Sequence, residues 1–92
     1  MTNKYEVALV LSVANGDEAV NALKEKFNDL IAKNGTVENV DEWGKRRLAY
    51  PINDEAEGYY IFTTMTSEPT LPAELERVAG ITEGVLRIMV IR

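Results

Sequence analysis

The sequence predicts one α+β domain in which four antiparallel strands form a sheet and two helices lie on one face of that sheet. Three observations point to this class. The chain has 92 residues, which is the length of a single domain. Four segments have the β-branched, aromatic or alternating apolar pattern of strands. Two further segments repeat apolar residues with the period of a helix. We therefore treat residues 1–92 as one domain.

The first strand and the first helix are predicted at residues 5–12 and 17–33. The strand alternates with a period of two, and the set that should face the core contains only large side chains: Tyr5, Val7, Leu9 and Leu11. In the helix, apolar residues recur at helical spacing. Asn15 or Asp17 can cap the first turn of this helix, and Gly35 supplies a left-handed stop after the last turn.

A long bent strand is predicted at residues 36–52, followed by a hairpin. β-branched and aromatic residues are frequent in this segment, and Gly44 marks a bulge or bend. Pro51 cannot donate a hydrogen bond to a neighbouring strand, so we expect it on a strand at the edge of the sheet. Residues 53–58 form a polar turn, and residues 59–66 resume with the composition of a strand.

The last part of the chain predicts a second helix and a final strand. Residues 67–70 open a helix whose apolar stripe stops near Gly80. The final strand, residues 85–91, splits into two faces, with Leu86, Ile88 and Val90 toward the core and Val85, Arg87, Met89 and Ile91 away from it. The resulting order of elements is the ferredoxin-like, split βαβ (βαββαβ) arrangement. Two such helices cover only one face of a four-stranded sheet, so the other face is left to water or to a partner.

The composition excludes most enzyme chemistry. The chain has no cysteine and no histidine, which removes thiolate nucleophiles, disulfides, the commonest general base and the commonest metal ligands. We therefore expect a binding protein rather than an enzyme, with no cofactor, no metal and no small-molecule substrate. The first residues enter a strand without a long apolar stretch, so we expect neither a signal peptide nor a membrane span, but a cytoplasmic protein.

Positive charge is concentrated in one run of the chain. Fifteen acidic and ten basic residues leave a net charge of −5, which disfavours binding to nucleic acid unaided. Lys45, Arg46 and Arg47 form the densest basic cluster, and their side chains can hold phosphates. Two alternatives remain open. The run can protect an edge strand from pairing with another chain, or it can balance nearby acidic residues, namely Glu38, Asp41 and Glu42.

Several side chains near the uncovered sheet face are candidates for binding. Tyr60 and Phe62 point the same way, and we place them on the uncovered face because the first and last strands already supply the core with large residues. Arg87 also faces away from the core, where it can contact a partner or a phosphate. It can instead pair with Glu6 if the first and last strands are neighbours. For Trp43 we expect burial at the bend, with stacking on RNA as the alternative.

The segment from Gly44 to Asn53, GKRRLAYPIN, resembles the signature of the bacterial small-subunit ribosomal protein S6 family. Further matching positions follow in the family's order along nearly the whole chain: Tyr5-Glu6, Trp43, Gly58-Tyr59-Tyr60 and Val85-Leu86-Arg87. This pattern agrees with the independently derived order of elements, so the resemblance is specific.

The resemblance implies a ferredoxin-like structural protein of the small ribosomal subunit that catalyses nothing. It implies binding to the central domain of small-subunit ribosomal RNA as a heterodimer with the small, basic ribosomal protein S18. A basic partner fits the negative charge of this chain, since affinity for RNA grows with the number of phosphates neutralised. Many family members carry a C-terminal extension, whereas this sequence ends at Arg92, so we expect no contacts from such a tail.

The candidate residues divide into two hypothetical surfaces. The RNA backbone is expected to meet the basic run and the start of the first strand, which are Lys4, Tyr5, Lys45, Arg46 and Arg47. The protein partner is expected to meet the open sheet face and its edge, with Tyr60, Phe62, Arg87 and Met89. Two other functions fit the same fold: a stand-alone RNA-binding module that stacks bases on aromatic residues, and a self-associating regulatory domain that binds a small ligand.

Overall fold

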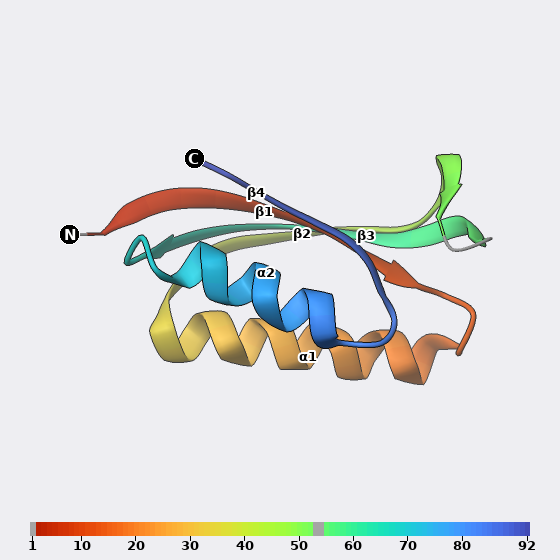
Figure 1. Ribbon diagram of the computed structural model, residues 1–92, viewed down its shortest axis with the longest axis horizontal. Helices are drawn as coiled ribbons and strands as arrows, with labels where there is room; N and C mark the ends of the chain where they lie inside the picture. Colours follow the sequence, from red (N-terminus) through yellow and green to blue (C-terminus); the bar gives the residue numbers. More distant parts are fainter. Residues whose placement is uncertain (1, 53–54) are drawn as a thin grey trace.

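The computed structural model describes residues 2–52 and 55–92. Its elements follow the predicted order: β1 (Asn3–Ser12), α1 (Asp17–Asn34), β2 (Gly35–Ile52), β3 (Glu55–Ser67), α2 (Leu71–Ile81) and β4 (Val85–Ile91). The four strands form one antiparallel sheet in the order β2-β3-β1-β4. Both helices lie on the same face of this sheet, and neither covers the opposite face (Figure 1). The ferredoxin-like prediction is confirmed.

The two ends of α1 differ from the prediction. The capping residue is Gly16, not Asn15 or Asp17, and no side chain makes a capping hydrogen bond. After the last turn, Gly35 has an extended backbone with a φ of −171° rather than a left-handed one. Both predicted end signals were therefore wrong. At the C-terminal end the reason is that the chain passes from α1 into β2 without an intervening turn residue.

The hydrophobic core lies between the sheet and the two helices. β1 contributes the alternating set predicted from its sequence, and β3 adds Ile61 and Met65. The helices close the core with their buried apolar residues, which are Val20, Phe27 and Ile31 of α1 and Leu71, Leu75 and Ala79 of α2. Because this core occupies one side of the sheet, alternate side chains of every strand point away from it. Neither helix of the described chain has the length and apolarity needed to cross a membrane.

One residue of β4 lies on the opposite face from the one predicted. Val10 of β1 pairs with Arg87, but the next residue, Leu11, pairs with Val85, so that Leu86 is skipped by a bulge. Val85 consequently packs against the core instead of facing away from it. Beyond the bulge the predicted alternation between the core and the open face is confirmed.

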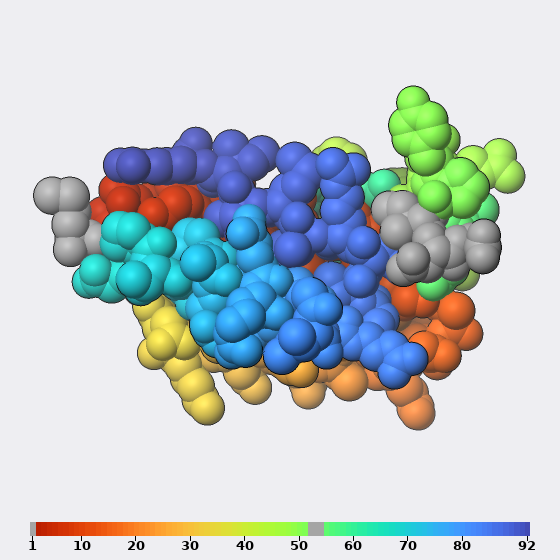
Figure 2. All heavy atoms as spheres, viewed as in Figure 1, coloured from red at the N-terminus to blue at the C-terminus, as the bar shows by residue number. Residues whose placement is uncertain are grey.

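Strand β2 is an edge strand, as its proline predicts, and its pairing is irregular. A bulge between Glu42 and Gly44 leaves Trp43 opposite no residue of β3, and Gly44 has a φ of +79°. After Arg47 the pairing with β3 is interrupted until the last residue of the strand. The intervening residues 48–51, here called the arm, rise from the end of the sheet on the side away from the helices (Figures 1 and 2).

The hairpin between β2 and β3 is tighter than predicted. Strand β3 begins at Glu55, so residues 55–58 of the expected turn already belong to the strand. Glu57 and Gly58 pair with Arg47 and Arg46, which extends the ladder toward the tip of the hairpin. Residues 53 and 54 of the expected turn lie outside the described residues.

Candidate functional site

The uncovered face of the sheet carries rows of side chains that lie next to one another across β4, β1 and β3. The strand registers define three such rows: Arg87, Val10 and Tyr60; Met89, Ala8 and Phe62; Ile91, Glu6 and Thr64. Successive rows are about 7 Å apart, since residues on one face are two positions apart along a strand. The first two rows are therefore apolar except for one guanidinium and one phenol hydroxyl, and the third row is polar on β1 and β3.

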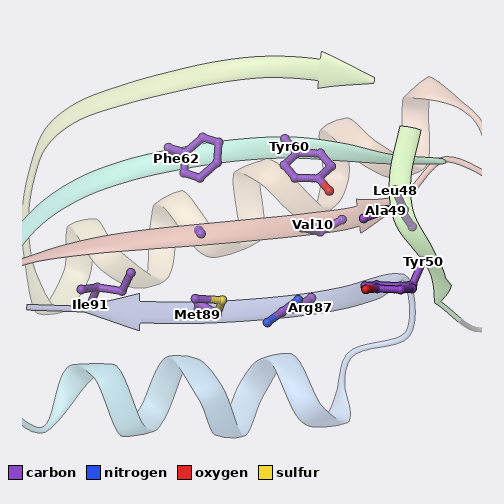
Figure 3. A pocket seen from close by; sticks show the side chains of 10 residues that line it. Val10, Leu48, Ala49, Tyr50, Tyr60, Phe62, Arg87, Met89 and Ile91 are labelled. Atoms are coloured by element: carbon purple, nitrogen blue, oxygen red, sulfur yellow. The ribbon is translucent and has the colours of Figure 1, made fainter. Parts of the chain in front are cut away.

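These rows and the arm enclose a groove of about 390 Å³. Its floor is formed by Ala8 and Val10 of β1, between the aromatic rings of β3 and the longer side chains of β4 (Figure 3). The arm closes one end with Leu48 and Tyr50, and the side chain of Tyr50 is 81% exposed. Ten described residues line the groove, and among these ten only Arg87 carries a positive charge. A contiguous apolar surface of this kind is typical of an interaction site.

The structure confirms the orientation predicted for three residues of the partner surface. Tyr60 and Phe62 are half-buried, Met89 is exposed, and all three line the groove. Leu48 of the arm is buried over Gly58, which anchors the arm beside these residues. That these side chains bind a partner stays a prediction.

Trp43 is not buried at the bend, so the expectation for this residue was wrong. Its side chain is 49% exposed, and its ring packs on Phe62 with the two ring centroids 4.6 Å apart. The indole nitrogen donates a hydrogen bond to Asp41 Oδ2 at 3.0 Å. On an edge strand no further strand lies outside Trp43 to cover the ring. Together with Tyr60, the tryptophan extends an aromatic surface across β2 and β3.

Tyr50 is a second residue that the sequence reasoning missed. The sequence places it in the long bent strand at residues 36–52, but the arm carries it away from the sheet to the rim of the groove. The neighbouring Pro51 is a signal that could have found it, because a residue that cannot join the ladder favours departure of the chain from the sheet.

Arg87 does not form the ion pair that was its alternative explanation. It pairs with Val10 across β1 and β4, whereas Glu6 pairs with Ile91, four positions further along. Four strand residues span roughly 13 Å, and no ion pair or hydrogen bond joins the two side chains. Arg87 is exposed and has no hydrogen-bond or ion-pair partner among the described residues. Its guanidinium therefore stands unpaired at one side of the groove.

No ion pair joins the basic run to an acid in the described part of the chain, although Glu57 of β3 lies directly opposite Arg47. Lys45, Arg46 and Arg47 are all exposed, and Arg46 Nη1 donates to the carbonyl oxygen of Lys45 at 3.2 Å. The acids expected to balance the run accept hydrogen bonds elsewhere: Glu38 from Thr66, Asp41 from Trp43, and Glu42 from Lys24 and Tyr59. None of these three acids forms an ion pair with the run. Phosphate binding and protection of the edge strand stay predictions.

The two other residues expected to meet RNA do not join the basic run. Lys4 is exposed near the start of β1. Arg46 pairs with Gly58, which pairs with Ser12, eight positions further along β1, so the two basic positions are roughly 27 Å apart along the sheet. Tyr5 is 8% exposed and belongs to the core, so an RNA contact at this position is not supported.

A polar network on the helix side joins α1 to the sheet. Lys24 Nζ and Tyr59 Oη each donate a hydrogen bond of 2.8 Å to Glu42 Oε1. The hydrogen bond from Lys24, and next the one from Tyr59, lowers the pKa of the Glu42 carboxyl. The bond to Glu42 is also the main cause that raises the pKa of Lys24 and of Tyr59. The three groups satisfy one another, so the network has a structural role. Across the described residues no cluster of acidic side chains is arranged to hold a metal ion.

Comparison with known families decides what kind of protein carries this groove. Residues 4–92 match the model of the family described as Ribosomal protein S6. The chain belongs to the ribosomal protein S6 family. The resemblance seen in the sequence is thus confirmed over nearly the whole chain. Membership of this family makes the chain a structural protein of the small ribosomal subunit rather than an enzyme. Its location is the cytoplasmic ribosome.

Individual relatives support the assignment over most of their length. The chain is 52% identical over 88 residues to the small ribosomal subunit protein bS6 of Clostridium novyi, covering 95% of this chain and 93% of the relative. It is 50% identical over 90 residues to bS6 of Clostridium perfringens strain SM101, covering 97% and 95%. The crystal structure of 30S ribosomal protein S6 from Thermotoga maritima superposes with a TM-score of 0.92 at 23% identity, covering 100% of this chain and 88% of that chain. This structural match shows the shared fold.

Proposed function

We propose that the chain binds the central domain of small-subunit ribosomal RNA jointly with ribosomal protein S18 and fixes RNA helices relative to one another. The observation that carries this proposal is the apolar groove on the uncovered sheet face, with an unpaired basic run at the arm end of the same sheet. The groove provides a surface for a protein, and the basic run provides a surface for phosphates.

The protein partner occupies the groove. Its aromatic rings and Met89 offer the apolar, weakly charged surface that is characteristic of the centre of a protein interface. Trp43 and Tyr50 enlarge this surface on the side of β2 and the arm. A small protein that covers these side chains removes them from water and is thereby held in a fixed orientation.

The RNA backbone meets the run Lys45, Arg46 and Arg47. These side chains are exposed and form no ion pair within the described residues, so binding phosphates does not require breaking one. Lys4, at the far end of β1, supplies a separate contact. Both positions lie on the sheet, whereas helices α1 and α2 carry six acidic and four basic residues and repel phosphates.

A basic partner explains how a chain of net charge −5 assembles on RNA. Alone, the chain neutralises few phosphates, so its affinity for RNA is low at physiological salt. The partner adds its own cations to the three of the basic run, and the complex presents one continuous positive surface.

Titration of an RNA fragment of the central domain tests this proposal. The fragment is titrated with this chain, with S18, and with both, at fixed salt, and with an unrelated RNA of equal length as control. Tight binding is expected when both proteins are present. Equally tight binding by this chain alone supports the stand-alone RNA-binding module instead. Absence of specific binding by the mixture overturns the proposal.

A further inference from the structure

Arg87 places a single positive charge among apolar side chains on the open face. Its nearest neighbours on that face are Val10 across β1 and Met89 two positions along β4. The close-up of the groove shows its guanidinium on the same side of the sheet as Tyr60 and Met89 (Figure 3). The nine other described residues that line the groove are aliphatic, aromatic or methionine.

No acidic group of the described chain is placed to neutralise this guanidinium. Glu6 is on the same face but roughly 13 Å away along the strands. Asp41 and Glu38 also belong to the open face, but they lie across on the edge strand β2 and accept hydrogen bonds from Trp43 and Thr66. The groove is therefore open to an acceptor that comes from outside.

A partner that covers the groove removes the charged guanidinium of Arg87 from water. In the free chain the guanidinium is hydrated, but a partner that packs on Met89 and Phe62 displaces this water. Burial of an unpaired charge is strongly unfavourable, whereas a carboxylate satisfies a guanidinium with two parallel hydrogen bonds. An occupant that is apolar throughout is thus disfavoured relative to one that carries a carboxylate at the right place.

We infer that the groove binds a short apolar segment of the protein partner that places one aspartate or glutamate carboxylate against Arg87. This inference rests on the proposed function, in which a protein occupies the groove. The strands that flank the floor, β3 and β4, are separated by β1, so they are about 10 Å apart, which is the diameter of one helix. A partner that is basic as a whole must then present a local acidic residue in this segment.

A protein carboxylate fits the position better than an RNA phosphate. Phosphate sites on proteins gather several cations, and the basic run supplies such a group at the arm end of β2. Arg87 stands alone, with apolar side chains on both neighbouring positions of its face. A single guanidinium in apolar surroundings matches a single carboxylate flanked by apolar side chains.

The test is the affinity of purified S18 for variants of this chain in the absence of RNA, measured by calorimetry. Arg87→Glu should weaken the heterodimer about 100-fold, because two carboxylates then face each other in the covered groove. Arg87→Met, which keeps an unbranched apolar stem but not the charged guanidinium, should weaken it about 10-fold. Arg92→Glu is the matched control, since Arg92 follows β4 and bonds to Asn3 outside the groove, and it should leave the affinity unchanged.

Charge reversal in the partner identifies the acceptor. Each aspartate and glutamate of S18 is changed to lysine, and one of these variants should restore binding to the Arg87→Glu chain. The fold of each variant is checked by circular dichroism and thermal unfolding, and tolerance is expected because Arg87 is exposed. Failure of every reversal to restore binding overturns the inference.

Three further outcomes separate this inference from the proposed function. If Met89→Ser weakens the heterodimer while Arg87→Glu and Arg87→Met do not, the groove binds the partner without a carboxylate, and the inference alone fails. If none of the groove variants changes the affinity for S18, the proposed partner surface fails with it. If Arg87→Glu spares the heterodimer but weakens RNA binding, Arg87 holds a phosphate, and the inference is overturned.

Discussion

The ring of Trp43 packs on the ring of Phe62, with centroids 4.6 Å apart and planes inclined at 55°. The contact joins the edge strand β2 to β3 on the open face of the sheet. It exists because the bulge before Gly44 and the absence of a strand beyond β2 leave the indole on the surface. Trp43 is the one tryptophan of the chain, so its fluorescence reports whether a partner covers this face.

Occupation of the groove should therefore be visible in tryptophan fluorescence. Trp43 is 49% exposed in the free chain, so a partner that covers Phe62 should shield the indole and reduce its quenching by acrylamide. The measurement uses S18 with its own tryptophans, if any, replaced by phenylalanine. RNA bound by the basic run alone should leave the quenching constant unaltered, and an unchanged value on S18 binding would place the partner elsewhere.

Removal of the basic run should flatten the salt dependence of assembly. Replacing Arg46 and Arg47 with alanine deletes two exposed cations, and each phosphate that is no longer neutralised should lower the slope of log K against log salt by about 0.7–0.9. The measurement is RNA binding by the heterodimer between low and physiological salt. The double variant Lys33→Ala, Arg77→Ala removes the same charge from the helix side and should retain the slope. Equal slopes for the two double variants would assign the arginines to another role.

Alanine at two glycines should change stability in opposite directions. Gly44 has a φ of +79°, so Gly44→Ala should destabilise the fold by about 1 kcal/mol through backbone strain, since no atom obstructs the new methyl group. Gly80 lies exposed in α2 with open space around it, so Gly80→Ala should stabilise by about 0.5–1 kcal/mol. Urea unfolding of both variants is the measurement. A stabilising Gly44→Ala would contradict the left-handed bulge.

Replacement of Glu42 by glutamine should alter stability in a pH-dependent way. The lowered pKa of Glu42 means that its charged form stabilises the folded chain above about pH 4.5. This contribution is lost as the pH falls through the folded pKa. At pH 7 the variant should be less stable by about 0.2–1 kcal/mol, the range of exposed ion pairs, and the difference should shrink as the pH falls below about 4.5. Chemical unfolding across this range is the measurement.

Glu25→Gln provides the control for this series, because Glu25 is exposed on the same helix as Lys24. Its stability difference from the parent chain should be small at every pH. The raised pKa values of Lys24 and Tyr59 imply that the network remains complete up to about pH 10. A Glu42 effect of equal size at pH 3 and pH 7 would show that hydrogen bonding, not charge, stabilises the network.

Much of the open face could be predicted because alternation along a strand is a local property. Tyr60 and Phe62 share a face whatever the rest of the chain does, and the core set of β1 leaves the opposite face to the remaining residues. The pairing of Arg87 could not be predicted in the same way. Whether it meets Glu6 or Val10 depends on the register between β1 and β4, which the turn geometry and a bulge determine.

The sequence by itself determined the order of the six elements, the side of the sheet that carries the core, the exclusion of cysteine and histidine chemistry, and the family. These properties follow from periodicity, composition and a contiguous motif, all of which are local. The tertiary structure decided that Trp43 is exposed, that Tyr50 rises beside the groove and that Arg87 is unpaired. Each of these depends on which distant residues become neighbours, and the bulge between β1 and β4 shifts those neighbours by one position without a mark in the sequence like Gly44.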